Sequence, residues 1–228
     1  MRRRCGGGRV SIHAGVRGGD MMSDDDTIDG EEHPFDYTGV HAFLFIDQVQ
    51  EGRSPEQVVE KLREAGKPPI MYASTFVGDF VAFAHVRVES LSELQNLIDG
   101  TIWEAGARCT WGLESPVSTL GAKRKSPGII ALTRIKIQPG HADDARNSLA
   151  EAGDMEGTGF VGASVITGEY DILLQMTGGS LEDAKTNIMN ALGPIQDVVM
   201  RTSTAFADGN RTAARYGRIP LNATSPEG

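Results

Sequence analysis

From about residue 40 the chain alternates between segments with strand-like and helix-like hydrophobic patterns. An apolar run of strand length comes first, followed by a helix whose start is marked by Ser54 and Pro55. Two strands come next, joined at the turn dipeptide Gly78-Asp79, and a helix and a closing strand complete the series. The expected elements are strands at 41–49, 70–77, 80–88 and 107–115, with helices at 54–66 and 91–102. This is a βαββαβ order.

The same order returns about 90 residues later. Residues 73–80 (ASTFVGDF) match residues 163–170 (ASVITGEY), and residues 90–93 (SLSE) match residues 180–183 (SLED) at the same offset. The expected elements of this second copy are strands at 129–137, 160–167, 170–177 and 198–206, with helices at 141–152 and from Leu181 onward. Several matches in one order predict an internal duplication.

The pattern predicts an α+β fold of two tandem ferredoxin-like (βαββαβ) sandwiches. Each unit forms a four-stranded antiparallel sheet with both helices on one face. The other face carries apolar side chains such as Phe83 and Leu173. At about 25 cal/mol per Å² of apolar surface, leaving it in water forfeits several kcal/mol of stabilisation. We therefore expect the open faces to pack together as in a dimeric α/β barrel, either within one chain as a pseudo-dimer or in a homo-oligomer.

The expected domain boundaries follow from the repeat. Residues 38–115 form the first domain, residues 116–127 a linker, and residues 128–208 the second domain. Residues 1–37 are predicted to be a disordered tail, with Met21 or Met22 as a possible true start, and residues 209–228 a flexible tail.

Composition narrows the class of protein. The 228 residues carry a net charge of −9, which argues against direct nucleic-acid binding. No apolar stretch approaches the roughly 18 residues of a membrane helix, so no membrane association is expected. The two cysteines do not form a disulfide framework, which favours the cytoplasm.

The second copy carries a short motif around its hairpin turn. It reads Gly168-Glu169-Tyr170-Asp171 before an apolar strand, and Thr202-Ser203-Thr204 lies in the closing strand. With these residues, the stretch from Gly162 to Phe206 resembles the C-terminal effector-binding (RAM) domain of the Lrp/AsnC family. The first copy matches at Gly78-Asp79-Phe80, but Val81 stands where the family has Asp. No helix-turn-helix precedes either copy.

The resemblance implies a stand-alone regulatory or oligomerisation module that binds a small-molecule effector, usually an amino acid, and is not an enzyme. Its implied ligand-binding residues are Gly168, Glu169, Tyr170, Asp171, Thr202, Thr204, Gly78, Asp79 and Phe80. Asp171 either binds the ligand's ammonium group or caps backbone NH groups of the turn. No cofactor, catalytic residue or metal ligand is expected, because the histidines show no ligand-like spacing and His85 is read as a solvated or hydrogen-bonded strand residue.

Two alternatives remain open. One is a dimeric α/β-barrel enzyme of the antibiotic-monooxygenase-like or chlorite-dismutase-like class. A haem enzyme of this type requires a proximal histidine on a helix, where only His141 lies near a helix start. A cofactor-independent oxygenase requires polar groups inside the barrel, for which Asn96 and Trp103 are the candidates. The other alternative is a purely structural oligomerisation unit without a ligand.

Overall fold

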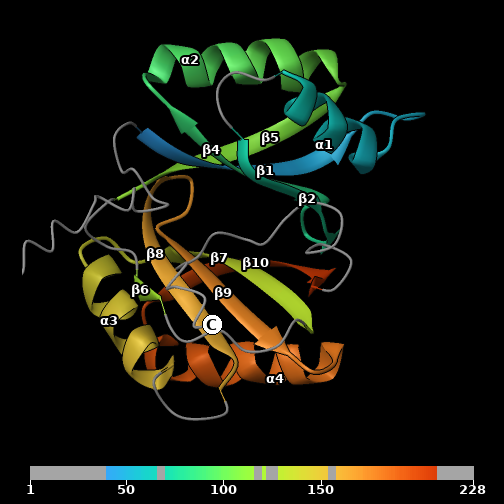
Figure 1. Ribbon diagram of the computed structural model, residues 1–228. Helices are drawn as coiled ribbons and strands as arrows, with labels where there is room; N and C mark the ends of the chain where they lie inside the picture. Colours follow the sequence, from blue (N-terminus) through green and yellow to red (C-terminus); the bar gives the residue numbers. More distant parts are fainter. Residues whose placement is uncertain (1–39, 66–69, 116–119, 122–127, 154–157, 210–228) are drawn as a thin grey trace, which may run out of the picture. The chain divides into compact units, whose positions relative to one another are not determined.

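The computed structural model describes residues 40–65, 70–115, 120–121, 128–153 and 158–209. They form an α+β fold with a large antiparallel sheet and four α-helices (Figure 1). In the first half, the elements are β1 (Val40–Val49), α1 (Pro55–Glu64), β2 (Ile70–Thr75), β3 (Val77–Gly78), β4 (Ala82–Val88), α2 (Leu91–Asn96), η1 (Leu97–Ile102) and β5 (Ala107–Glu114). In the second half they are β6 (Leu120–Gly121), β7 (Ile129–Ile137), α3 (Ala142–Gly153), β8 (Phe160–Gly168), β9 (Ile172–Gly178), α4 (Leu181–Leu192), η2 (Gly193–Ile195) and β10 (Val199–Asp208).

The expected strands and helices are confirmed to within a few residues, and local signals explain why. Ser54 and Gln57 form a reciprocal capping box at the start of α1. Ser90 and Ser180 accept hydrogen bonds from the backbone NH groups of Glu93 and Asp183 at the starts of α2 and α4. Among the described residues, no helix has the length and apolar character needed to cross a membrane. The predicted tails and most of the predicted linker lie outside the described residues.

Strand pairing follows the same plan in both halves. The order along the sheet is β2-β4-β1-β5-β8-β9-β7-β10-β3, and all pairings are antiparallel. Phe43 of β1 lies opposite His85 of β4 and Gly112 of β5. Leu132 of β7 lies in the same way opposite Gln175 of β9 and Ala205 of β10. Strand register therefore assigns each position of the first half a counterpart in the second.

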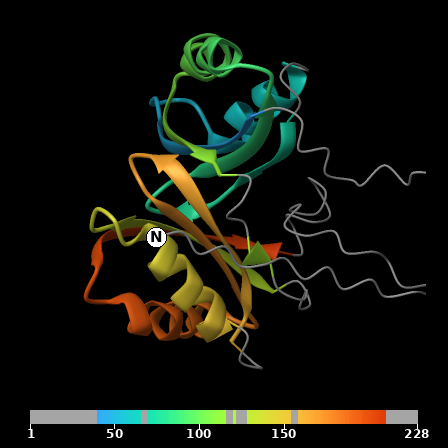
Figure 2. The same cartoon turned by 90° about the vertical axis from the view of Figure 1, so that its left-hand side faces the viewer.

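Each half packs its helices on one face of its own strands (Figures 1 and 2). Val58, Val59 and Leu62 of α1 are buried with Leu44 and Ile46 of β1 in one core cluster. Leu149 of α3 and Ile188 of α4 are buried with Ile135, Ile172 and Leu174 in another. Because strand side chains alternate, these clusters use every second strand residue and leave the opposite face of the strands for other contacts.

That opposite face forms a third cluster, the inner cluster, to which both halves contribute. It is rich in aromatic rings on the first-half side and aliphatic side chains on the second. Its buried members are Phe43, Phe45, Tyr72, Phe76, Phe80, Phe83, Leu132, Ile166, Tyr170, Leu173, Ala205 and Ala207. The apolar residues Phe83 and Leu173, expected on open sheet faces, thus belong to one cluster.

The halves also meet along two reciprocal strand seams. In one seam, β8 pairs with β5, placing Gly168 opposite Gly112. In the other, β3 pairs with β10, placing Gly78 opposite Ala205. In each seam, the glycine just before the hairpin turn of one half pairs with the closing strand of the other half.

We expect Gly78→Ala to lower the free energy of unfolding by about 1–3 kcal/mol. Gly78 has φ +146°, and a Cβ there would lie 2.5 Å from the carbonyl oxygen of Thr204, so the seam would have to open. Urea unfolding at equilibrium measures the loss. Gly100→Ala is the control, because a Cβ there meets nothing within 4 Å. An equal loss for both variants would show that the seam is not tightly packed.

Candidate functional site

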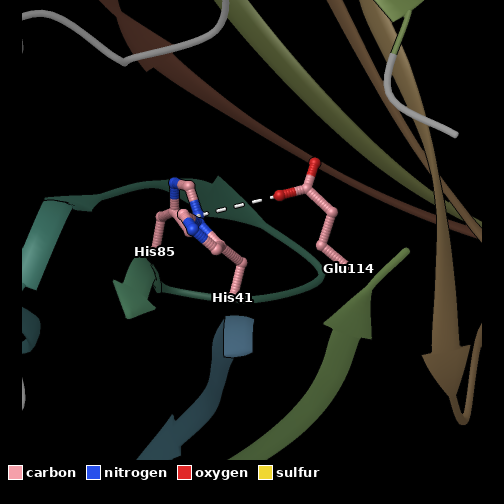
Figure 3. A group of neighbouring side chains, drawn as sticks. All are labelled: His41, His85 and Glu114. Atoms are coloured by element: carbon pink, nitrogen blue, oxygen red, sulfur yellow. Dashed lines mark hydrogen bonds and ion pairs between the residues drawn. The ribbon is translucent and has the colours of Figure 1, made fainter. Parts of the chain in front are cut away.

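Three ionisable side chains meet on the inner face of the first-half strands (Figure 3). His41 comes from β1, His85 from β4 and Glu114 from the end of β5. β1 is the strand between the other two, and the register places all three side chains on the face that carries Phe43. Pairing of three strands thus assembles the cluster, although its members are far apart in sequence.

The cluster is compact and buried. His41 Nδ1 lies 3.0 Å from His85 Nε2, and His85 Nε2 lies 3.8 Å from Glu114 Oε2. The residues His41 and His85 are 6% and 5% exposed. Their rings are tilted by 47° with centroids 5.2 Å apart, and the ring of Phe43 lies 4.8 Å from that of His85. The two imidazoles are therefore held in place by aromatic packing.

Burial controls the protonation of His85. Burial and, as the smaller cause, the neighbouring His41 together lower the pKa of His85 to about 3. At neutral pH His85 is consequently a neutral imidazole. The 3.0 Å contact then joins one N–H group to one nitrogen lone pair.

The second half of the chain reaches this cluster through Ser164. Its hydroxyl on β8 donates to Glu114 Oε1 at 2.9 Å, so one carboxylate oxygen is held while Oε2 is the oxygen nearest His85. Ser164 is 3% exposed. The carboxylate is therefore oriented across the β5–β8 seam.

This arrangement supports two kinds of chemistry. Neutral imidazoles and a carboxylate can transfer protons, and they are also ligands of transition metals. One ligand atom from each of His41, His85 and Glu114 lies within 4.8 Å of the others. The structure thus brings together His41 and His85, which show no ligand-like spacing in the sequence. Sequence spacing missed the pair because it depends on the β1–β4 register.

The counterparts of these three residues differ in chemistry. Phe43 corresponds to Leu132, so its strand partner His85 corresponds to Gln175. His41 lies two residues before Phe43 and therefore corresponds to Ile130. Glu114 lies two residues after Gly112 and therefore corresponds to Ala207, two residues after Ala205. The cluster is thus specific to the first half.

The hairpin residues expected to bind ligand in the second half are engaged with the protein itself. Asp171 accepts from Lys136 Nζ at 2.9 Å and from the backbone NH of Ile137 at 2.8 Å. Glu169 pairs with Arg201, and Gly168 lies in the β5–β8 seam. Asp171 thus holds a backbone NH, but this NH belongs to the end of β7 and not to the adjacent turn that the capping alternative named.

Tyr170 and its counterpart Phe80 surround a buried cation. The guanidinium carbon of Arg134 lies 4.7 Å from the ring centre of Tyr170 and 4.8 Å from that of Phe80. Arg134 donates to Asp47 Oδ1 at 2.9 Å, to the hydroxyl of Thr110 and twice to that of Ser203. This network joins the two halves.

The remaining expected ligand residues also contribute to the seam region. Asp79 Oδ2 accepts from the backbone NH of Thr204, and the Asp79 NH donates to the Thr204 carbonyl. The Thr204 hydroxyl lies 3.0 Å from that of Thr133, and Thr202 is exposed on β10. Gly78 is the seam residue described above.

The residues that the enzyme alternative required are placed differently from expectation. Asn96 is exposed and Trp103 is 66% exposed, so neither supplies the interior polar groups. His141 precedes α3 and is exposed, and the other described histidines belong to the buried cluster on strands. The described residues therefore do not fit a haem with a helical proximal histidine.

Burial and the charges of Asp47 and Asp99 raise the pKa of Cys109 to about 12, so its thiol is protonated at neutral pH.

No family model and no curated protein matches the chain. Solved structures do match. An anthrone oxidase-like protein is 13% identical with a TM-score of 0.51, covering 82% of this chain and 97% of that one. The siroheme decarboxylase NirDL, in complex with an iron-uroporphyrin III analogue, is 9% identical with a TM-score of 0.54, covering 78% and 72%. A mutant chlorite dismutase from Candidatus Nitrospira defluvii is 11% identical with a TM-score of 0.51, covering 78% and 95%.

These matches show the fold and correct two expectations. The neighbours are anthrone oxidase-like and chlorite dismutase-like proteins and a decarboxylase, so the assignment to the Lrp/AsnC RAM domain is wrong, and the expected amino-acid effector loses its support with it. In the structure, Gly168 of the motif pairs with β5, and Asp171 accepts a hydrogen bond from β7. The expectation of a non-enzyme is corrected as well, because enzymes use this fold.

Proposed function

We propose that this chain is an oxidoreductase of the dimeric α/β-barrel class that oxidises a small aromatic molecule with O2 at His41, His85 and Glu114. The observation that carries the proposal is the burial of these three ionisable groups together in an apolar interior. Burying such groups costs several kcal/mol unless they are compensated, and perturbed groups of this kind concentrate at functional sites.

The proposal also rests on the two halves acting as one barrel. We propose that residues 38–115 and 128–208 are two ferredoxin-like domains whose open faces pack together within the chain as a pseudo-dimer. The reciprocal seams and the inner cluster support this arrangement. The burial pattern also repeats without change between residues 71–80 and 161–170.

The aromatic rings packed beside the cluster support an aromatic substrate. Phe43 packs against His85, and Phe83 stacks on Phe43 with centroids 5.7 Å apart. Aromatic rings pack well against other rings, which favours a planar aromatic substrate. The likeness to an anthrone oxidase-like protein makes anthrone the first compound to test.

The reaction with anthrone balances without a further reductant. The methylene carbon of anthrone loses two hydrogens and becomes the second carbonyl of anthraquinone. One oxygen atom of O2 enters that carbonyl, and the other leaves as water with the two hydrogens. The four electrons lost by the carbon are the four gained by O2.

We expect the purified chain to consume one O2 per anthrone and form anthraquinone at least about 100-fold faster than its His85→Gln variant. An oxygen electrode and chromatography of the product measure this, with buffer alone as the background. His141→Gln is the control, because His141 is exposed and lies outside the cluster. A wild-type rate equal to the buffer rate, or equal loss in both variants, would contradict the proposal.

A further inference from the structure

We propose that His41 Nδ1, His85 Nε2 and Glu114 Oε2 hold one divalent transition-metal ion. The proposal names a cofactor for the site proposed above, and its role in oxidation rests on that function. Binding of the ion can nevertheless be measured without any turnover.

The separation of the two imidazole nitrogens suits a shared ion. Metal–imidazole bonds are about 2.1 Å long, so two ligands at right angles lie about 3.0 Å apart and two at the tetrahedral angle about 3.4 Å apart. His41 Nδ1 and His85 Nε2 are 3.0 Å apart. Binding an ion would require both rings to turn, so that their lone pairs point at the ion and no longer along the line between the two nitrogens.

The carboxylate completes the set at a compatible distance. Ligand atoms on an octahedral ion with bonds of about 2.1 Å are about 3.0 Å apart when adjacent and about 4.2 Å apart when opposite. The 3.8 Å from His85 Nε2 to Glu114 Oε2 lies between these limits. The three ligand atoms together lie within 4.8 Å of one another, so the Glu114 side chain would have to move toward the histidines to complete the set.

The donor set restricts the ion. Two imidazoles and one carboxylate suit Fe(II), Co(II) and Zn(II), whereas Ca²⁺ and Mg²⁺ select oxygen ligands. Three protein ligands leave coordination positions for other molecules, as in two-histidine–one-carboxylate oxygenase sites. The carboxylate offsets one of the two positive charges of the ion, which lowers the cost of burying it.

Ser164 is a positioning residue for this site. Its hydroxyl holds Glu114 Oε1 at 2.9 Å and so turns Oε2 toward the histidines. Groups that orient a ligand in this way typically contribute about 10- to 100-fold in metal affinity. The counterpart of Ser164 is Ser74, which lies opposite Phe83 as Ser164 lies opposite Leu173.

The test uses substitutions that the fold already accommodates at counterpart positions. His41→Ile, His85→Gln and Glu114→Ala copy Ile130, Gln175 and Ala207. The full untagged chain is stripped with EDTA and titrated with Co(II), which reports its geometry by absorption, and with Fe(II) under argon. Calorimetry gives the stoichiometry and Kd, and thermal unfolding of each metal-free variant shows whether it is folded.

We expect one ion per chain in the wild type and at least about 100-fold weaker binding in each of the three variants. Ser164→Ala should weaken binding about 10- to 100-fold, with restoration by Ser164→Thr. Ser74→Ala and His141→Gln should bind as the wild type does. If folded His85→Gln keeps wild-type affinity, or if the wild type binds no ion, His41 and His85 form only a hydrogen-bonded pair and the proposal fails.

The two proposals fail separately. Ion binding without anthrone oxidation overturns the proposed function and leaves the metal site standing. Anthrone oxidation that is unchanged after metal removal overturns the role of the ion in oxidation and leaves the proposed function standing. Equal losses of affinity in Ser164→Ala and Ser74→Ala overturn the positioning role alone.

Discussion

Acidification below about pH 6.5 is expected to destabilise the metal-free wild type much more than its His85→Gln variant. The unfolded chain binds a proton on His85 near the ordinary pKa of 6.5, whereas the folded chain does so only near pH 3. Between these values the unfolded state holds the extra proton, so stability falls as the pH falls. The stabilisation is complete above pH 6.5 and is lost toward pH 3.

The expected size of this difference in stability follows from the binding of one proton to His85. Each pH unit inside this window changes the difference between the two proteins by about 1.4 kcal/mol, which amounts to about 3 kcal/mol near pH 4. Urea unfolding in EDTA at several pH values measures it. Other groups face His85, namely His41 and Glu114, and both are retained in the variant. His141→Gln should follow the wild-type curve, and parallel curves for wild type and His85→Gln would contradict the burial of a neutral His85.

Arg134→Ala is expected to lower the free energy of unfolding by about 3 kcal/mol or more. The Arg134 side chain is 4% exposed and its partner Asp47 is 27% exposed, so the substitution leaves a half-buried carboxylate without its cation. It also removes hydrogen bonds to Thr110 and Ser203 and the cation contacts with Phe45, Phe80 and Tyr170. Equilibrium urea unfolding measures the loss.

Arg201 provides a matched control. Its guanidinium carbon lies 4.7 Å from the same Tyr170 ring, the distance also found for Arg134. Its side chain is 53% exposed and pairs with the exposed Glu169, so Arg201→Ala should cost much less than Arg134→Ala. Similar losses in the two variants would mean that burial of the Arg134 network contributes little.

The sequence predicts the local structure well because its signals are local. Ser54 and Gln57 are three residues apart and mark the start of α1 without help from the rest of the chain. The alternating apolar residues of β4 likewise predict a strand. The same alternation places His85 on the opposite face of β4. The surroundings of His85 depend on the elements that cover that face, which the local pattern does not predict.

The candidate site could not be predicted in this way because it is made by register and by contacts between halves. His41 and His85 are separated by 44 residues, and Glu114 takes its orientation from Ser164, which is 50 residues further on. The motif Gly168–Asp171 misled for a related reason. A glycine, an aromatic residue and an acid after a turn also suit a close strand seam, a cation contact and a backbone cap.

Arg134 has a further consequence for symmetry. It bonds Thr110 and Ser203, which are counterparts by register, and contacts Phe80 and Tyr170, which are counterparts in the repeat. The guanidinium thus contacts matched residues of both halves, while its own counterpart by register is the apolar Phe45. Two equal halves would each bring an arginine to this position, and the two positive charges would repel each other. Because the halves differ here, a single cation can contact both.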